Sequence, residues 1–187
     1  AVDVAAGSME CGPSAPGAAG SGPAGGPSMN LIVGSQHHFV RMANDEPVME
    51  GDVWSANVTV QNLTFQPMGT LDGTTASADG VRVFFVDEPT NGVVVSNHDG
   101  EATFLGSEPS KYYGYVGAAL GGDGILSPGE VSEAKSWAFE LNEATEFTFS
   151  VLVATEVPDP DGYAVGLTNV SVGSGLTCGE GSDDKLY

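Results

Sequence analysis

Apolar and polar residues alternate with a period of two along several short stretches of the chain. The clearest stretch runs from Val53 to Leu63, where Trp54, Ala56, Val58 and Val60 alternate with small polar residues. Successive side chains of a strand point to opposite faces, so this pattern predicts a strand with one buried and one solvated face. The sequence predicts further strands at residues 31–33, 37–42, 80–86, 93–95, 102–105, 112–116, 136–141, 146–153 and 165–172.

Turn residues separate these predicted strands at intervals of about ten residues. Asn91-Gly92 and Asp99-Gly100 are pairs that supply the positive φ of tight hairpin turns, so we expect hairpins there. No stretch keeps a helical period, and residues 130–135 allow one helical turn at most. The pattern is typical of an all-β chain, and we expect a single antiparallel β-sandwich over residues 29–178.

An N-terminal arm, residues 1–28, precedes this domain, and its part from Gly12 to Ser28 reads GPSAPGAAGSGPAGGPS. The glycines do not recur at every third position, which excludes collagen. The arm has no large apolar side chain after Cys11 to offset the entropy of ordering, so any ordered form needs a partner surface. Residues 2–5 alternate weakly and predict a short strand. An acidic tail, residues 179–187, follows the domain.

The charge balance is strongly acidic, with 25 Asp and Glu against 5 Lys and Arg and a formal net charge of −20. Such a chain is repelled by nucleic acid and by anionic membranes, so we expect neither as a partner. Carboxylates favour cations, above all Ca²⁺. A solvated acidic surface with no bound ion is the alternative. No stretch approaches the roughly 20 apolar residues that span a bilayer, so no membrane span is expected.

Four acidic residues in Gly- and Pro-bounded loops are the candidate metal ligands: Asp123, Glu130, Asp159 and Asp161. Ca²⁺ takes 6–8 oxygen ligands, more than one such loop supplies, so a second loop or chain has to contribute. Asp before Gly is also common in turns without any metal, because its side chain bonds the local backbone. Apart from Ca²⁺, no cofactor is expected.

The two cysteines, Cys11 and Cys178, lie near opposite ends of the chain. The sequence begins AVDVAAG without an initiator methionine, from which we expect a secreted, extracellular protein whose signal peptide has been cleaved. An even cysteine count in a secreted chain favours a Cys11–Cys178 disulfide. Two free thiols, or pairing of each cysteine with another chain, remain open. Asn57, Asn62 and Asn169 begin N-glycosylation sequons.

No catalytic motif is present: the sequence lacks a nucleophile elbow, a phosphate loop and zinc-ligand spacing, so we expect no enzyme. His37 and His38 are adjacent and would point to opposite faces of a strand. Tyr113 and Tyr115 lie on the same face of the predicted strand at residues 112–116 and could stack on a sugar. Trp54 and Trp137 are expected in the core.

The stretch from Gly80 to about Val157 resembles secreted bacterial immunoglobulin-like or fibronectin-type sandwich modules. The resemblance rests on GVRVFF from Gly80, DGEATF from Asp99, ILSPGE from Ile125, KSWAF from Lys135 and FTFSV from Phe147. It implies an extracellular immunoglobulin-like β-sandwich and carries no catalytic residues. The Gly/Pro arm and the cysteines lie outside it.

From these features we expect a structural subunit of an extracellular filament or surface assembly. The N-terminal arm would donate a strand to a neighbouring copy, with residues 1–11 or residues 29–33 as the donor. Copies of the same chain are then the partners, and divalent cations or high salt should support assembly. The alternative is a monomeric secreted module that binds glycan or calcium, with the arm folded back on its own domain.

Overall fold

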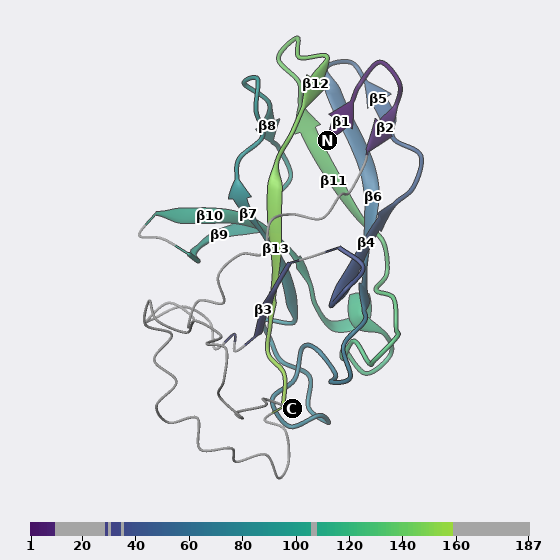
Figure 1. Cartoon of the computed structure of the whole chain (residues 1–187), viewed down its shortest axis with the longest axis vertical. Helices are drawn as coiled ribbons and strands as arrows, with labels where there is room; N and C mark the ends of the chain where they lie inside the picture. Colours follow the sequence, from purple (N-terminus) through teal and green to yellow (C-terminus); the bar gives the residue numbers. More distant parts are fainter. Residues whose placement is uncertain (10–28, 30, 35, 106–107, 159–187) are drawn as a thin grey trace, which may run out of the picture.

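The computed structural model describes residues 1–9, 29, 31–34, 36–105 and 108–158. Within them the chain is all-β, as predicted, with antiparallel strands and one short 3₁₀ helix (Figure 1). The elements are β1 (Val2–Asp3), β2 (Ser8–Met9), β3 (Leu31–Val33), β4 (Val40–Asn44), β5 (Val48–Glu50), β6 (Val53–Asn62), β7 (Val81–Asp87), β8 (Val94–Val95), β9 (Gly100–Thr103), β10 (Pro109–Tyr115), η1 (Gly117–Leu120), β11 (Lys135–Glu140), β12 (Glu146–Phe147) and β13 (Ser150–Thr155).

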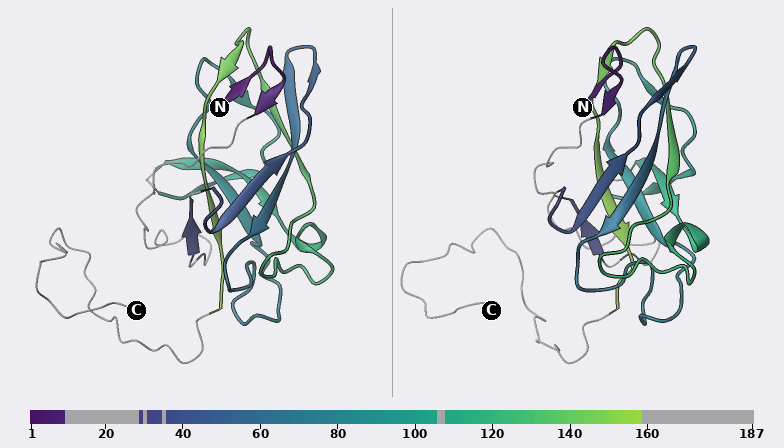
Figure 2. Two further views of the ribbon diagram at one scale, coloured as in Figure 1. Left: turned by 45° about the vertical axis from the view of Figure 1, so that its right-hand side comes forward. Right: turned by 90° about the vertical axis from the view of Figure 1, so that its right-hand side faces the viewer.

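The strands form two five-stranded sheets and one small three-stranded sheet. One large sheet has the order β3-β13-β7-β10-β9, and the other has the order β4-β6-β11-β8, with β5 paired to β6. The small sheet has the order β12-β1-β2. Residues from both large sheets meet in one core cluster, which makes the architecture sandwich-like (Figure 2).

The core follows directly from the alternation in the sequence. In β6, Trp54, Ala56, Val58 and Val60 are buried, as predicted, while Asn57 between them is exposed. The β11 side chains Trp137 and Phe139 lie beside them, and β7 and β10 contribute from the opposite sheet. These aromatic rings pack at centroid distances of 4.4 to 6.3 Å, the range in which ring pairs stabilise a core beyond the area they bury.

The predicted strand over residues 37–42 is wrong at its beginning. His37 has a φ of 72°, and its N–H donates to the Val40 carbonyl at 2.8 Å, so residues 37–39 form a turn. The strand β4 begins at Val40. His37 and His38 are both exposed in this turn and do not lie on opposite faces of a strand.

The predicted hairpins at residues 91–92 and 99–100 are also wrong, although the first turn has the expected local geometry. Asn91 and Gly92 have φ values of 59° and 75°. The strands on either side nevertheless belong to different sheets, because β8 pairs with β11 and β7 with β10 and β13. The chain crosses to the second sheet after β7 and returns after β8. The helical turn allowed at residues 130–135 does not form, and η1 lies earlier in the chain.

Gly80 lies close against the backbone of β10. Its φ is 56°, and a Cβ atom at this position would lie 2.2 Å from the Tyr115 carbonyl oxygen. The Gly80 carbonyl accepts a hydrogen bond from the buried Thr155 hydroxyl at 3.0 Å. Only glycine combines this backbone conformation with this separation.

Candidate functional site

The first nine residues, expected to be part of an extended arm, form a hairpin of their own. Asp3 Oδ1 accepts the Ala6 N–H at 2.9 Å, and Gly7 has a φ of 59°, so the turn between β1 and β2 is closed locally. Val2 is only 2% exposed, whereas most other side chains of the hairpin face solvent. Val2 is therefore the buried anchor of the hairpin, and the partly buried Val4 and Met9 pack against the core beside it.

The surface that receives this hairpin is the strand β12. Val2 pairs with Phe147, and the Val4 N–H donates to the Thr145 carbonyl at 3.1 Å. Phe147 in turn packs edge-on against Trp54, with ring centroids 6.0 Å apart. The hairpin thus covers the end of the aromatic core, and we call the surface formed by Thr145, Phe147 and Trp54 the β12 slot.

Both segments expected to act as donor strands pair within the chain. β1 lies beside β12, and β3 lies beside the far part of β13, with Leu31 opposite Thr155 (Figure 1). β12 and β13 are separated only by residues 148–149, so β1 and β3 pair with two strands that follow one another closely in the chain. The intervening residues 10–28 lie outside the described residues, and so do Cys11 and Cys178.

Asp123 and Glu130, the candidate metal ligands within the described residues, both bond to their own loop. Asp123 Oδ1 accepts the Ile125 N–H at 3.0 Å, and Glu130 Oε2 accepts the Ser127 N–H at 2.8 Å. Over the described residues, no group of three or more His, Cys, Asp or Glu side chains comes together to hold an ion. Asp159 and Asp161 lie outside those residues, so the calcium site stays a prediction.

The sequon residues Asn57 and Asn62 differ sharply in their surroundings. Asn57 is exposed, and its Nδ2 donates to Asp45 Oδ2 at 2.7 Å. Asn62 is fully buried, and both ends of its amide are hydrogen-bonded. A glycan therefore has no access to Asn62 in the folded chain, because the amide faces the interior. Asn169 lies outside the described residues.

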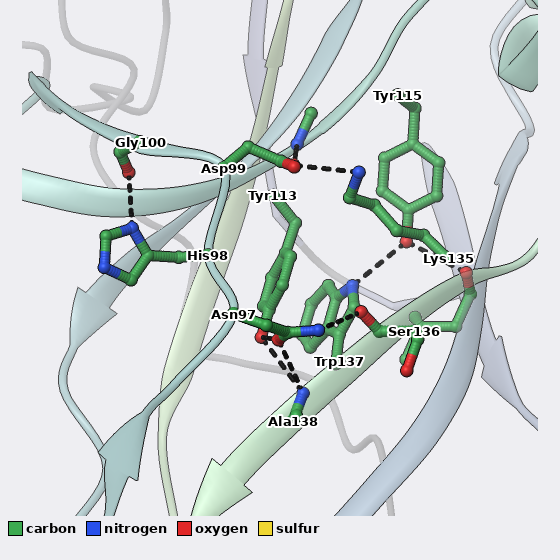
Figure 3. A network of polar contacts seen from close by, with 12 residues as sticks. Asn97, His98, Asp99, Gly100, Tyr113, Tyr115, Lys135, Ser136, Trp137 and Ala138 are labelled. Carbon is green, nitrogen blue, oxygen red and sulfur yellow. Dashed lines mark hydrogen bonds and ion pairs between the residues drawn. The ribbon is translucent and has the colours of Figure 1, made fainter.

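A polar network ties the two large sheets together beside β10 and β11 (Figure 3). Asn97 Oδ1 accepts from the Tyr113 hydroxyl at 2.6 Å and from the Ala138 N–H at 2.8 Å. Asp99 Oδ2 accepts the Gly114 N–H at 2.6 Å and lies 3.0 Å from Lys135 Nζ. These bonds hold the crossing segment between β8 and β9, so the network is structural.

Tyr113 and Tyr115 share a face of β10, as predicted, but that face is the core. Both are fully buried, and Tyr113 stacks on Trp137 at a centroid distance of 4.4 Å. Tyr115 donates to the Val58 carbonyl at 2.9 Å and accepts from Trp137 Nε1 at 3.2 Å. The proposed sugar-stacking surface of these two tyrosines is therefore wrong, while the expected core positions of Trp54 and Trp137 are confirmed.

Alkaline titration provides a direct check of this packing. Burial raises the pKa of Tyr113 and of Tyr115 well above the ordinary value of about 10. Since both folded pKa values exceed the unfolded one, their contribution to stability is complete below about pH 10 and declines above it. We expect two of the five tyrosines to ionise only as the circular dichroism of the fold is lost. In Tyr113→Phe, only one tyrosine should show this delayed ionisation. Ionisation of all five in the native state would contradict the buried placement.

The loop after β6 presents an aromatic ring to solvent, a feature that the sequence pattern does not predict. Phe65 is 100% exposed, the largest exposed fraction among the large apolar side chains described. The Asn62 side chain closes the loop beneath it, as the Asn-x-Thr pattern would allow in a turn. The Asn62-Leu-Thr pattern fits both a sequon and an Asn-closed turn, so the sequence alone does not distinguish the two.

Comparison with known proteins gives no match: no family model, no curated protein and no solved structure matches the chain. Among the described residues, no helix has the length and apolar character needed to cross a membrane.

Proposed function

We propose that this chain is a structural subunit of an extracellular filament or surface assembly, in which the β1–β2 hairpin of one copy fills the β12 slot of the next. The observation that carries the proposal is the burial of Val2 in the β12 slot. The hairpin that contains Val2 is joined to the rest of the domain through a long Gly/Pro-rich segment. A hairpin on such a tether makes the same contacts in its own slot or in a neighbour's. In a neighbour it would act as a donated strand.

Two further features support an open assembly. The hairpin and the slot are different surfaces, so a contact between copies is heterologous and extends as a filament unless the rotation closes a ring. The sandwich-like frame is suited to an extracellular module, and we propose the immunoglobulin or fibronectin type for it. With a net charge of −20, subunits repel one another, and Ca²⁺ or high salt would reduce that repulsion.

A charge placed on the buried face of the hairpin tests this function. We expect Val2→Asp to abolish hairpin exchange and so to shorten the assemblies, because an unpaired carboxylate cannot enter the apolar slot. Ala5→Asp adds the same charge at an exposed position of the same hairpin and should assemble normally. Each full-length chain is refolded from urea at high protein concentration and high salt, and its size is measured by sedimentation velocity and negative-stain imaging.

A synthetic peptide of residues 1–9 adds a second measurement. In excess during refolding it should occupy the slots and shorten the assemblies of the unmodified chain. A chain that stays monomeric under all these conditions would support the alternative, a monomeric secreted module with its hairpin in its own slot. Assembly of Val2→Asp to normal length would contradict hairpin exchange.

A further inference from the structure

We propose that Phe65 is the knob of a second contact between copies of this chain, and that a groove at the β7 and β10 ends is its socket. The knob is Phe65 on the loop after β6. The socket is lined by Val86, Phe104, Leu105 and Pro109, with Glu88 and Glu108 beside them. This contact deepens the proposed assembly but uses no residue of the hairpin or of the β12 slot.

The loop holds Phe65 rigidly, although the ring itself touches nothing. Asn62 Oδ1 accepts the Thr64 N–H and hydroxyl, both at 2.8 Å. Asn62 Nδ2 donates to the Gln66 carbonyl at 2.8 Å and to the Leu126 carbonyl at 2.9 Å. A preorganised aromatic side chain loses little conformational entropy on binding, which is the property of an interface anchor.

The end of the loop is fastened as well. Gln66 Nε2 donates to the Pro158 carbonyl at 2.8 Å, and the Asn62 carbonyl accepts the Gly129 N–H at 2.7 Å. The loop is thus tied to two distant parts of the chain. An exposed ring on so well-bonded a support indicates a partner surface rather than a loose turn.

The socket is a groove of mixed apolar and polar lining among the described residues, and it is large enough for such a ring. Its volume is about 490 Å³, within the range of pockets that bind small organic groups. Val86 is 43% and Leu105 is 45% exposed, so apolar surface is open to an incoming side chain. Lys111 Nζ lies 3.0 Å from Glu88 Oε2 and offsets part of the charge beside it.

The absence of charge on the loop favours Phe65 of another copy as the occupant of the socket, compared with the other, acidic surfaces of this chain. No charged residue occurs between Val53 and Leu71, so the loop approaches the glutamates of the socket without like-charge repulsion. Figure 1 shows the loop between β6 and β7 at the lower end of the molecule, whereas the β9–β10 pair projects from its side. Knob and socket are thus separate surfaces, and their contact is head-to-tail.

Full-length variants test the contact by sedimentation velocity under the assembly conditions given above. Phe65→Ser and Leu105→Glu should each weaken association by about 30-fold or more, the effect of removing an interface anchor. Leu71→Ser removes a side chain that is 53% exposed on the same connection and should change nothing. Circular dichroism should be unchanged throughout, because these side chains are exposed.

Mixing the two defective variants gives the decisive result. When both chains also carry Val2→Asp, which blocks hairpin exchange, Phe65→Ser keeps its socket and Leu105→Glu keeps its knob, so together they should form a one-to-one dimer that neither forms alone. Unchanged association of Phe65→Ser, an equal loss with Leu71→Ser, or a wild type that stops at dimers would overturn the contact. If association is lost with Val2→Asp but not with Phe65→Ser, hairpin exchange stands and the knob contact is wrong. If association is lost with Phe65→Ser but not with Val2→Asp, the knob contact stands and hairpin exchange is wrong.

Discussion

Gly80→Ala is expected to lower the free energy of unfolding by about 2–5 kcal/mol, the sum of backbone strain and overpacking. The φ of 56° disfavours any side chain, and the new Cβ would lie 2.2 Å from the Tyr115 carbonyl oxygen. That oxygen belongs to the backbone of β10, where Tyr115 is fully buried, so it cannot move aside cheaply. Urea unfolding followed by circular dichroism measures the loss.

Gly92→Ala is the matched control for this variant. Gly92 has a φ of 75° but no atom within 4 Å of the position of a Cβ. Its replacement therefore reports the backbone strain alone, about 1–2 kcal/mol. Equal losses for the two variants would show that the close approach of Gly80 to β10 contributes nothing.

Asn62→Ala is expected to lower the free energy of unfolding by about 2–4 kcal/mol. The substitution leaves the Thr64 N–H without its partner and removes one of the two donors to the Leu126 carbonyl, which keeps the Met68 N–H at 3.0 Å. Groups that lose a hydrogen bond in the interior pay their desolvation without compensation. Proteolysis of the loop after β6 should accelerate as well, because the loop loses the bonds that close it.

Asn57→Ala is the control on the same strand. The Asn57 side chain is exposed and bonds Asp45, and that hydrogen bond holds the pKa of Asp45 below its usual range. Water replaces this bond when the amide is removed, so we expect less than half the loss found for Asn62→Ala. A loss as large as that of Asn62→Ala would contradict the interior role of Asn62.

Local patterns predicted the fold class because burial acts on every second residue of a strand. The alternation of β6 identified its buried face, Trp54 included, and the same pattern in β11 identified Trp137 as a core residue. The pairing of β8 with β11 was not predictable in the same way. It depends on long-range contacts, and the Asn91-Gly92 turn specifies only its own φ values.

The candidate site was predictable to a smaller extent. Period two places Tyr113 and Tyr115 on one face, but it does not say whether that face is inward, and here packing on Trp137 makes it the core. The weak alternation of residues 2–5 did indicate β1. The pairing of β1 with Phe147 and the exposure of Phe65 depend on the whole fold, so no local signal reveals them.

The tether of the β1–β2 hairpin sets a concentration scale. A segment of the length and composition of residues 10–28 reaches up to roughly 60 Å, at about 3.1 Å per residue. For a linker of this length, the effective concentration of the tethered group is in the millimolar range. Under the proposed hairpin exchange, a dilute chain would therefore recapture its own hairpin, and exchange would become competitive only when neighbours are crowded. A crowded cell surface, or a second contact that holds two copies together, would supply that condition and make assembly switch on over a narrow range of protein density.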